Sequence, residues 1–229
     1  MSHVDGCMAQ YVRLPVESLI KLPEAMPPHI GALIEPLAVA VHGIARASLQ
    51  DVRLAAVLGA GPIGLLTALV AQASGIEHVV ISDVRSSRLR LAQELGLEAV
   101  HAEEELYTHL MDRSDKNGAD IVYECAGHPS SAREMTTLLR PRGTIVNLSV
   151  FKEPVAIDMQ AVNFKELEIV GSRVYERKDF QAAVDMAMHL PLERIVTHSF
   201  PLLEVTAAFE RFSTGEACKV IILPGAAKR

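Results

Sequence analysis

The segment 54–83 constrains the fold of this chain more than any other part of the sequence. An apolar run at 54–58 leads into the glycine pattern G-x-G-x-x-G at 59–64. A helix-like stretch at 63–74 follows, and then a second apolar run that ends at Asp83. This order of strand, glycine turn, helix, strand and acid is typical of a βαβ unit that binds a dinucleotide.

Each glycine of this pattern has a separate physical role. Gly59 permits the tight turn out of the strand, Gly61 lets the backbone approach a pyrophosphate, and Gly64 lets the helix pack closely on the sheet. The first amides of the helix and its dipole would face the two phosphates. The glycine pattern and its flanking strands therefore predict a dinucleotide site.

Asp83 bears on the choice of dinucleotide. Its carboxylate is expected to accept hydrogen bonds from the adenosine ribose and to repel a 2′-phosphate, which favours NAD over NADP. Two arginines that follow, Arg85 and Arg88, leave NADP open, because basic side chains near this position can serve a 2′-phosphate.

Composition narrows the classes of partner. The chain has 229 residues, a formal net charge of −6 and no basic stretch, which argues against nucleic acid and anionic membranes as partners. It shows neither an apolar run of transmembrane length nor a signal peptide, so a cytoplasmic location is expected. The three cysteines form no C-x-x-C pair, so neither a disulfide framework nor a four-cysteine zinc site is expected.

Along the rest of the chain, the spacing of apolar residues predicts strands that alternate with helices. A strand is predicted at 8–14 and a helix at 30–47. Beyond the glycine unit, further strands are predicted at 99–101, 119–126, 144–150, 167–174, 195–200 and 219–223. Further helices are predicted at 86–95, 129–139, 177–190 and 203–212. The alternation indicates an α/β protein with a doubly wound parallel sheet.

Four segments of the sequence share motifs with one known protein family. The stretch D-G-C-M-A-Q-Y-V at 5–12 resembles the D-G-G-F-A-E-Y-V motif of that family, and I-E-P-L-A-V-A-V-H at 34–42 resembles the E-P-L-A-V-A-x-H helix of its polyol branch. The segments 165–172 and 218–222 continue the match in the same order, so the sequence resembles the zinc-dependent medium-chain alcohol and polyol dehydrogenases. Within the family, the sequence is most similar to sorbitol, threonine and 2,3-butanediol dehydrogenases.

The resemblance implies a Rossmann sheet with remnant strands of a truncated chaperonin-10-like catalytic domain. In the family that domain precedes the position where this sequence begins, and it carries the zinc-binding motifs. On this basis residues 1–28 are expected to be a remnant of the catalytic domain, 29–190 the NAD-binding Rossmann domain, and 191–229 a segment that returns to the catalytic domain. Apolar surface is then expected to be exposed at four residues of these outer regions, Tyr11, Val12, Val220 and Ile222.

The resemblance also implies the reaction and its partners. Family members oxidise a secondary alcohol, such as a polyol, a diol or threonine, by hydride transfer to NAD while zinc polarises the alcohol oxygen. The implied partners are a small-molecule alcohol substrate and further copies of the chain in a homo-oligomer. No catalytic residue is assigned within this chain, and an alternative is left open, namely a module that binds NAD and catalyses nothing.

Cofactor residues carry over from the family position by position. The residues implied for the phosphate turn are Gly59, Gly61, Pro62, Ile63 and Gly64. Those implied for the adenosine ribose are Asp83 and Arg88. Those implied for the nicotinamide side are Leu148, Ser149, Val150, Ser172 and Arg173.

Glu35 is the sole residue that matches a family position near the metal. A catalytic zinc needs about three protein ligands, so zinc is not expected to be retained by this chain. Without the resemblance, Glu35 is a first-turn glutamate that complements the helix dipole. His42 lies on the same helical face, where a packing histidine is favoured over a second metal ligand. His128 is interpreted either as a cleft residue or as a plain loop histidine, and Cys125 as a small buried apolar residue.

Overall fold

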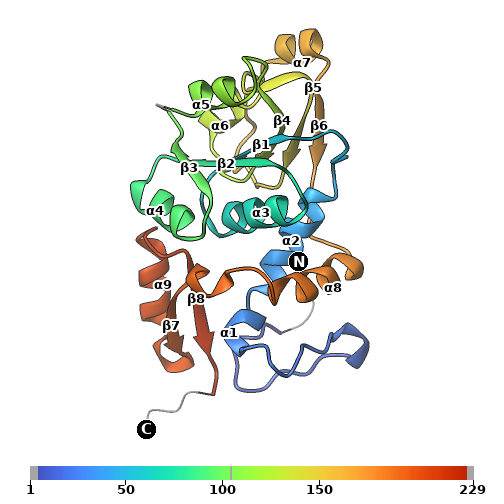
Figure 1. The fold of residues 1–229 in the computed structure, drawn as a ribbon. Helices are drawn as coiled ribbons and strands as arrows, with labels where there is room; N and C mark the ends of the chain where they lie inside the picture. The colour runs from blue at the N-terminus through green and yellow to red at the C-terminus, as the bar shows by residue number, and fades with distance from the viewer. Residues whose placement is uncertain (1–4, 104, 226–229) are drawn as a thin grey trace.

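Six parallel strands form the main sheet of the protein (Figure 1). The structure, a computed structural model, describes residues 5–103 and 105–225; the ends of two predicted regions, 1–4 and 226–229, lie outside them. The strands are β1 (Leu54–Leu58), β2 (His78–Asp83), β3 (Glu98–His101), β4 (Ala119–Glu124), β5 (Leu139–Asn147) and β6 (Glu168–Gly171). Their order is β3-β2-β1-β4-β5-β6, and every neighbouring pair is parallel. This is the doubly wound sheet that the sequence predicts.

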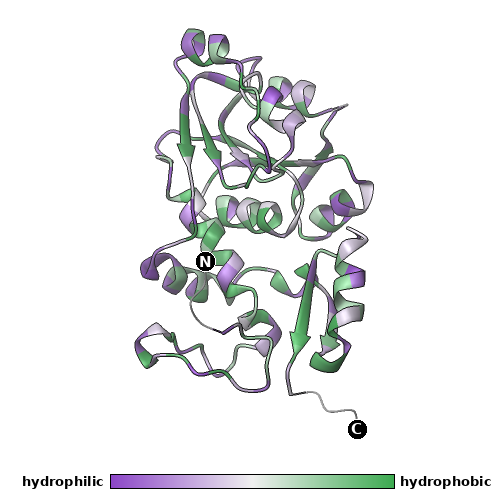
Figure 2. Cartoon of the chain, turned by 180° about the vertical axis from the view of Figure 1, so that it is seen from behind, coloured by the Kyte–Doolittle hydropathy of each residue, from purple (hydrophilic) through white to green (hydrophobic). Residues whose placement is uncertain are grey.

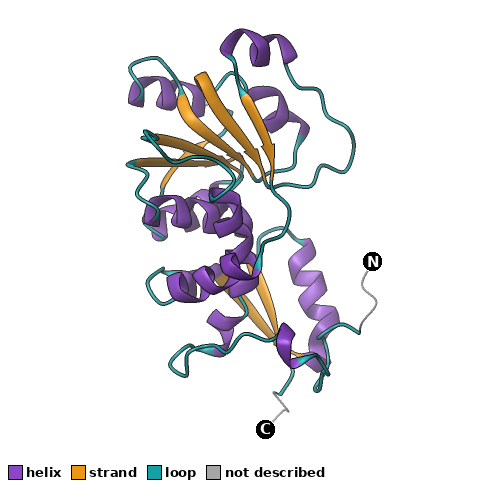
Figure 3. Cartoon of the chain, turned by 90° about the vertical axis from the view of Figure 1, so that its right-hand side faces the viewer, coloured by secondary structure: helices purple, strands orange, loops and turns teal. Residues whose placement is uncertain are grey.

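Helices connect the strands and lie on both sides of the sheet (Figure 3). The connecting helices are α3 (Pro62–Ala73), α4 (Ser86–Glu94), α5 (Leu106–Arg113), α6 (Pro129–Glu134) and α7 (Met159–Lys165). The helices outside the sheet connections are α1 (Pro28–Gly31), α2 (Ile34–Ile44) and α8 (Arg177–Ala187), together with the 3-10 turns η1 (Val16–Ser18), η2 (Leu192–Ile195) and η3 (Leu202–Glu204). Within the described ranges, no helix has the length and apolar character needed to cross a bilayer.

Strand β1 shows why the sheet is buried on both faces. Ala55 and Val57 belong to one hydrophobic cluster with residues of α2 and α3, whereas Leu54, Ala56 and Leu58 belong to a second cluster with residues of α5 and α6. Successive side chains of a strand point to opposite faces, so a continuously apolar strand needs cover on each. The strands and α3 are accordingly mostly hydrophobic in Figure 2.

The C-terminal unit consists of β7 (Val196–Pro201), α9 (Val205–Ser213) and β8 (Lys219–Leu223). Strands β7 and β8 pair in parallel as a separate two-stranded sheet, which lies next to α9 and below α4 in Figure 1. The same hydrophobic cluster contains Met26, Val57, Ile195 and Cys218. The core therefore draws on all three regions expected from the sequence, and the division of the chain at 28 and 190 stays a prediction.

The predicted strand at 8–14 is wrong. The structure has no strand between residues 5 and 20 and places only η1 there. A strand needs a neighbour for its backbone N–H and C=O groups, and none of the described strands pairs with this segment. Tyr11 and Val12 are 92% and 50% exposed, as predicted, whereas Val220 and Ile222 are half-buried because β8 packs against β7 and α9.

Other details of the secondary structure also differ from the sequence patterns. The predicted helix at 30–47 is divided into α1 and α2, α6 ends at Glu134, and α7 was not predicted. The strand predicted at 144–150 instead begins at Leu139, and residues 141–143 lie inside β5 as an irregularity, because the β4–β5 pairing skips from Leu139 to Thr144.

Gly64→Ala tests the packing of α3 on the sheet. A Cβ atom at Gly64 would lie 1.8 Å from the carbonyl oxygen of Gly59, so the turn or the helix must shift. We expect the free energy of unfolding to fall by about 1–3 kcal/mol, measured by urea denaturation. Gly61→Ala is the matched control: its Cβ would meet nothing within 4 Å, and the expected loss is below about 1 kcal/mol. Equal losses in the two variants would contradict this account.

Candidate functional site

A cleft of about 450 Å³ opens at the carboxyl ends of the central strands. Its walls come from the turn after β1, from the residues after β2 and β3, and from the loop and helix after β4. The strand order reverses between β1 and β4, and ligands of doubly wound sheets bind at such a reversal. A cavity of about 460 Å³ lies elsewhere, between the amino-terminal segment and α8, but it lacks the glycine turn and the acid.

The glycine turn leaves donors free at the floor of the cleft. Gly59 has φ +96°, and a Cβ there would lie 2.9 Å from Cα of Ala126 in the loop after β4. Gly61 borders the cleft, and a Cβ there would project into open space. Helix α3 begins at Pro62 with no side-chain hydrogen bond to its first amides. These amides can therefore bind an anion in the space beside Gly61.

Asp83 lies at the end of β2 with only 6% of its surface exposed. Its Oδ2 accepts hydrogen bonds from the Ala60 amide at 2.9 Å and from Arg88 Nη1 at 3.2 Å, and its Oδ1 accepts one from the Arg85 amide at 2.9 Å. A carboxylate offers about four acceptor positions, so these bonds leave about one for a ligand hydroxyl. The acid thus secures the glycine turn and also borders the cleft.

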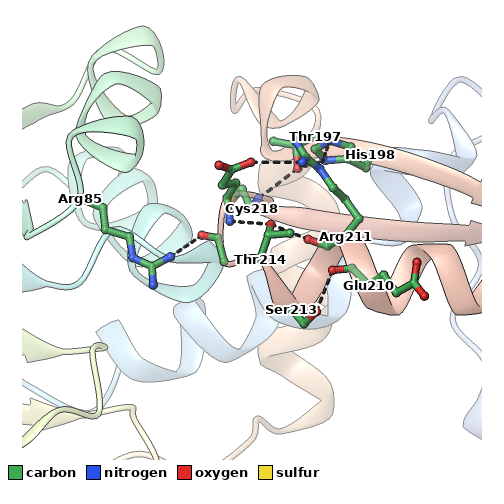
Figure 4. Close-up of polar contacts among 10 residues, drawn as sticks. Arg85, Thr197, His198, Glu210, Arg211, Ser213, Thr214 and Cys218 are labelled. Carbon is green, nitrogen blue, oxygen red and sulfur yellow. Dashed lines mark hydrogen bonds and ion pairs between the residues drawn. The ribbon is translucent and has the colours of Figure 1, made fainter.

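Arg85 points to the C-terminal unit. Its Nη1 donates to the carbonyl oxygen of Gly215 at 2.6 Å, in the turn between α9 and β8 (Figure 4). A second contact joins the same parts of the chain, since Arg194 Nη1 lies 2.8 Å from Glu94 Oε2 at the end of α4. The C-terminal unit therefore reaches the rim of the cleft through Arg85, which lines it.

The residues implied for the nicotinamide side lie beyond β5 and β6, outside the lining of this cleft. Ser149 Oγ contacts Glu124 and Asn147, and Val150 is exposed. The side chain of Leu148 is directed at α2, where a Cβ on Gly43 would come within 2.4 Å of it.

The two residues implied after β6 lie next to the end of β5. The Ser172 amide donates to the Asn147 carbonyl oxygen at 2.9 Å. Ser172 Oγ is buried and has no hydrogen-bond partner within the described ranges, while Arg173 is exposed. The structure therefore brings Gly59, Gly61, Asp83 and Arg88 together in one cleft. Pro62, Ile63 and Gly64 form the start of α3 outside the lining of the cleft, and the other five predicted residues lie at the neighbouring strand ends.

Glu35 does not form a metal centre with the described residues. It is exposed in the first turn of α2. His42 instead lies 2.7 Å from Asp179, which also accepts a hydrogen bond from the Glu176 amide, so this histidine joins α2 to α8. Over residues 5–103 and 105–225, no three His, Cys, Asp or Glu side chains are placed to hold a metal ion. These residues alone do not fit a catalytic zinc.

Cys125 and His128 border the cleft in structural roles. Burial raises the pKa of the Cys125 thiol to about 12, so the thiol stays protonated at neutral pH. Its Sγ lies 3.8 Å from Thr67 Oγ1 on α3. His128 caps α6 by accepting a hydrogen bond from the Ser130 amide at 3.2 Å. The packing interpretation of Cys125 agrees with this environment.

Sequence patterns missed Glu124, Ser131 and Glu134. Ser131 and Glu134 line the cleft from α6, and Glu124 is completely buried at the end of β4. A signal for Glu124 was present, because it is the one charged residue in the apolar run 121–127. A carboxylate in a buried strand calls for hydrogen-bond donors around it.

The sequence of this chain is similar to the sequences of known dehydrogenases. The sequence pattern of the family described as zinc-binding dehydrogenase matches residues 62–189. An L-threonine 3-dehydrogenase of Bacillus licheniformis is 32% identical over 226 residues, which are 96% of this chain and 65% of that protein. A sorbitol dehydrogenase of Halalkalibacterium halodurans is 33% identical over 227 residues, which are 96% of this chain and 66% of that protein. The chain thus spans just under two thirds of the length of these relatives.

Solved structures agree with the sequence relatives. A zinc-binding dehydrogenase of Sinorhizobium meliloti 1021, bound to NADP, matches with a TM-score of 0.86 and 28% identity over 96% of this chain and 66% of that one. An alcohol dehydrogenase of Escherichia coli CFT073, complexed with NADH, matches with a TM-score of 0.82 and 27% identity over 92% of this chain and 64% of that one. The family match, the strand order and the glycine turn lead to one conclusion: the chain belongs to the zinc-binding dehydrogenase family.

Proposed function

We propose that the chain binds NAD across the carboxyl edge of its sheet. The pyrophosphate would lie on the free amides of α3 beside Gly61, and the adenosine ribose would lie against Asp83. The nicotinamide half would extend over the ends of β4 and β5, on the other side of the point where the strand order reverses. The observation that carries the proposal is the joint presence of the open glycine turn and the buried acid in one cleft.

The arrangement around Asp83 favours NAD over NADP. A 2′-phosphate on the ribose would meet this carboxylate, which is already paired with Arg88. Arg85 is engaged with Gly215 and would have to leave that bond to reach a phosphate. The two solved relatives hold NADH and NADP respectively, so the choice of NAD rests on the geometry of this chain.

For the whole protein we propose oxidation of a secondary alcohol, of the polyol, diol or threonine type. Bound NAD supplies the hydride acceptor for this reaction, and the strand-end residues Ser149, Val150 and Ser172 would border its nicotinamide. The relatives named as threonine and sorbitol dehydrogenases support this substrate class. We also propose that Glu35 lies near the metal in the whole protein, and we assign it no chemical step.

A module that binds NAD without catalysis is the second candidate function. It is favoured by the lack of three converging metal ligands in the described ranges.

The first proposal also includes a homo-oligomer. Strand β6 lies at the edge of the sheet with Ile169 exposed, and an edge strand can pair with a second copy of the chain.

Titration with NADH tests the cofactor site. We expect the fluorescence of NADH to change on binding, and Gly61→Ala to weaken that binding about ten-fold or more, because its methyl group would occupy the space proposed for the pyrophosphate. Gly6→Ala is the matched control, since a Cβ there also meets nothing within 4 Å but lies outside the cleft. A wild-type chain that fails to bind NADH at millimolar concentration would overturn the proposal.

Asp83→Ala tests the choice of cofactor. The variant should bind NADH more weakly and raise the affinity ratio of NADPH to NADH, because the carboxylate that disfavours a 2′-phosphate is gone. It should also lose about 1–3 kcal/mol of unfolding free energy, since the Ala60 and Arg85 amides lose their acceptor. Asp185→Ala on the exposed side of α8 should change neither property. An unchanged cofactor ratio would show that Asp83 does not contact the ribose.

A turnover assay tests the non-catalytic module. Sorbitol, 2,3-butanediol and threonine are each incubated with the chain, NAD and zinc, and NADH formation is followed by absorbance. For this chain alone we expect NADH binding without turnover, because its described residues supply no complete zinc site. NADH formation that a chelator abolishes would eliminate the non-catalytic module.

A further inference from the structure

The carboxylate of Glu124 lies at the centre of a hydrogen-bonded cluster at the end of β4. The side chain is completely buried. Its Oε1 accepts hydrogen bonds from the amides of Ala126 at 3.1 Å and Gly127 at 3.0 Å, and from Ser131 Oγ at 2.7 Å. Its Oε2 lies 3.3 Å from the Gly127 amide and also contacts Ser149 Oγ. One side chain thereby joins the loop after β4, helix α6 and the end of β5.

These partners are neutral groups: two backbone amides and two hydroxyls. A buried carboxylate is costly unless donors satisfy it, so losing one partner affects the placement of the others. Gly127 is part of the same cluster: it adopts φ +65°, and a Cβ there would lie 3.4 Å from the Cβ of Ser149. The hydrogen bonds of this cluster therefore hold its segments in place. An apolar residue at position 124 would form the strand equally well but would make none of these bonds.

The two sides of the cluster face different parts of the proposed cofactor site. Ala126 and Ser131 line the cleft that holds Gly61 and Asp83. Ala126 also contacts the glycine turn, since a Cβ on Gly59 would lie 2.9 Å from its Cα. Ser149 follows β5, two strands from β1 and on the side away from β2. A ligand that crosses the point where the strand order reverses would therefore contact the segment at Ala126 and Ser131 and also the segment at Ser149, both of which Glu124 holds.

We propose that Glu124 is a positioning residue that fixes the nicotinamide-side segment at Ser149 relative to the adenosine-side loop at Ala126 and Ser131. This inference rests on the proposed binding of NAD. Glu124 acts through its hydrogen bonds and does not touch the ligand itself. The link through Ser149 serves the nicotinamide half, and the link through Ser131 serves the adenosine half.

ADP-ribose and NADH separate the two links, because ADP-ribose has the adenosine and both phosphates but no nicotinamide. Ser149→Ala removes the link toward β5 and should raise the Kd of NADH about three- to ten-fold while the Kd of ADP-ribose changes less than about two-fold. Ser131→Ala removes the link toward α6 and should raise both Kd values by a similar factor. Calorimetric titration of each ligand gives these values, and thermal melting checks that each variant is folded.

Variants at Glu124 test whether geometry is the cause. In Glu124→Gln the amide oxygen can still accept from the Ala126 and Gly127 amides, and the amide nitrogen can donate to Ser149 Oγ, whose proton then bonds Asn147 Oδ1. We expect both Kd values to stay within about three-fold of wild type. Glu124→Ala removes every link and should weaken NADH more than ADP-ribose. If that variant does not fold, Glu124→Asp gives the same comparison, because its shorter side chain draws the carboxylate away from Ser149.

Different outcomes overturn different statements. Binding of NADH that is unchanged in Ser149→Ala, or an equal loss of NADH and ADP-ribose in that variant, would overturn the positioning role while the proposed NAD site stands. A wild-type chain that binds neither ligand would overturn both.

Discussion

The close approach of α3 to β1 is the contact on which the cleft depends. No side chain fits at Gly64, because the Gly59 carbonyl oxygen occupies the place of its Cβ. This approach sets the first amides of α3 directly beyond the end of β1, where the strand order reverses. Asp83 then holds the same turn from β2 through the Ala60 amide. The donors and the acid lie close together because Gly64 permits this close approach and Asp83 holds the turn.

Local sequence patterns predicted much of this fold. The strands and the glycine turn follow from continuous apolar runs that stop at glycine or an acid, and β1, β2 and α3 appear within about one residue of their predicted bounds. The prediction of a strand at 8–14 was wrong because strand pairing depends on distant parts of the chain, which a local apolar pattern does not reveal. Helix α7 was missed because it buries none of its residues and so shows no apolar face.

The candidate site was predictable only in part. Gly61 and Asp83 are found by spacing, since their roles depend on the turn and the strand that carry them. The position of Leu148 illustrates the limit: a residue at a strand end can point to a neighbouring helix, and its direction depends on packing against Gly43. Glu124, Ser131 and Ser149 meet only in three dimensions, because their separation along the chain conceals the cluster.

The Arg85–Gly215 hydrogen bond joins the rim of the cleft to a unit that has its own small sheet. Any rigid-body swing of that unit away from α4 must break this bond. The contact between Arg194 and Glu94 lies just before β7, at the position where such a motion would begin. A hinge motion of the C-terminal unit would therefore change the shape of the adenosine end, and a ligand seated there would in turn resist the motion.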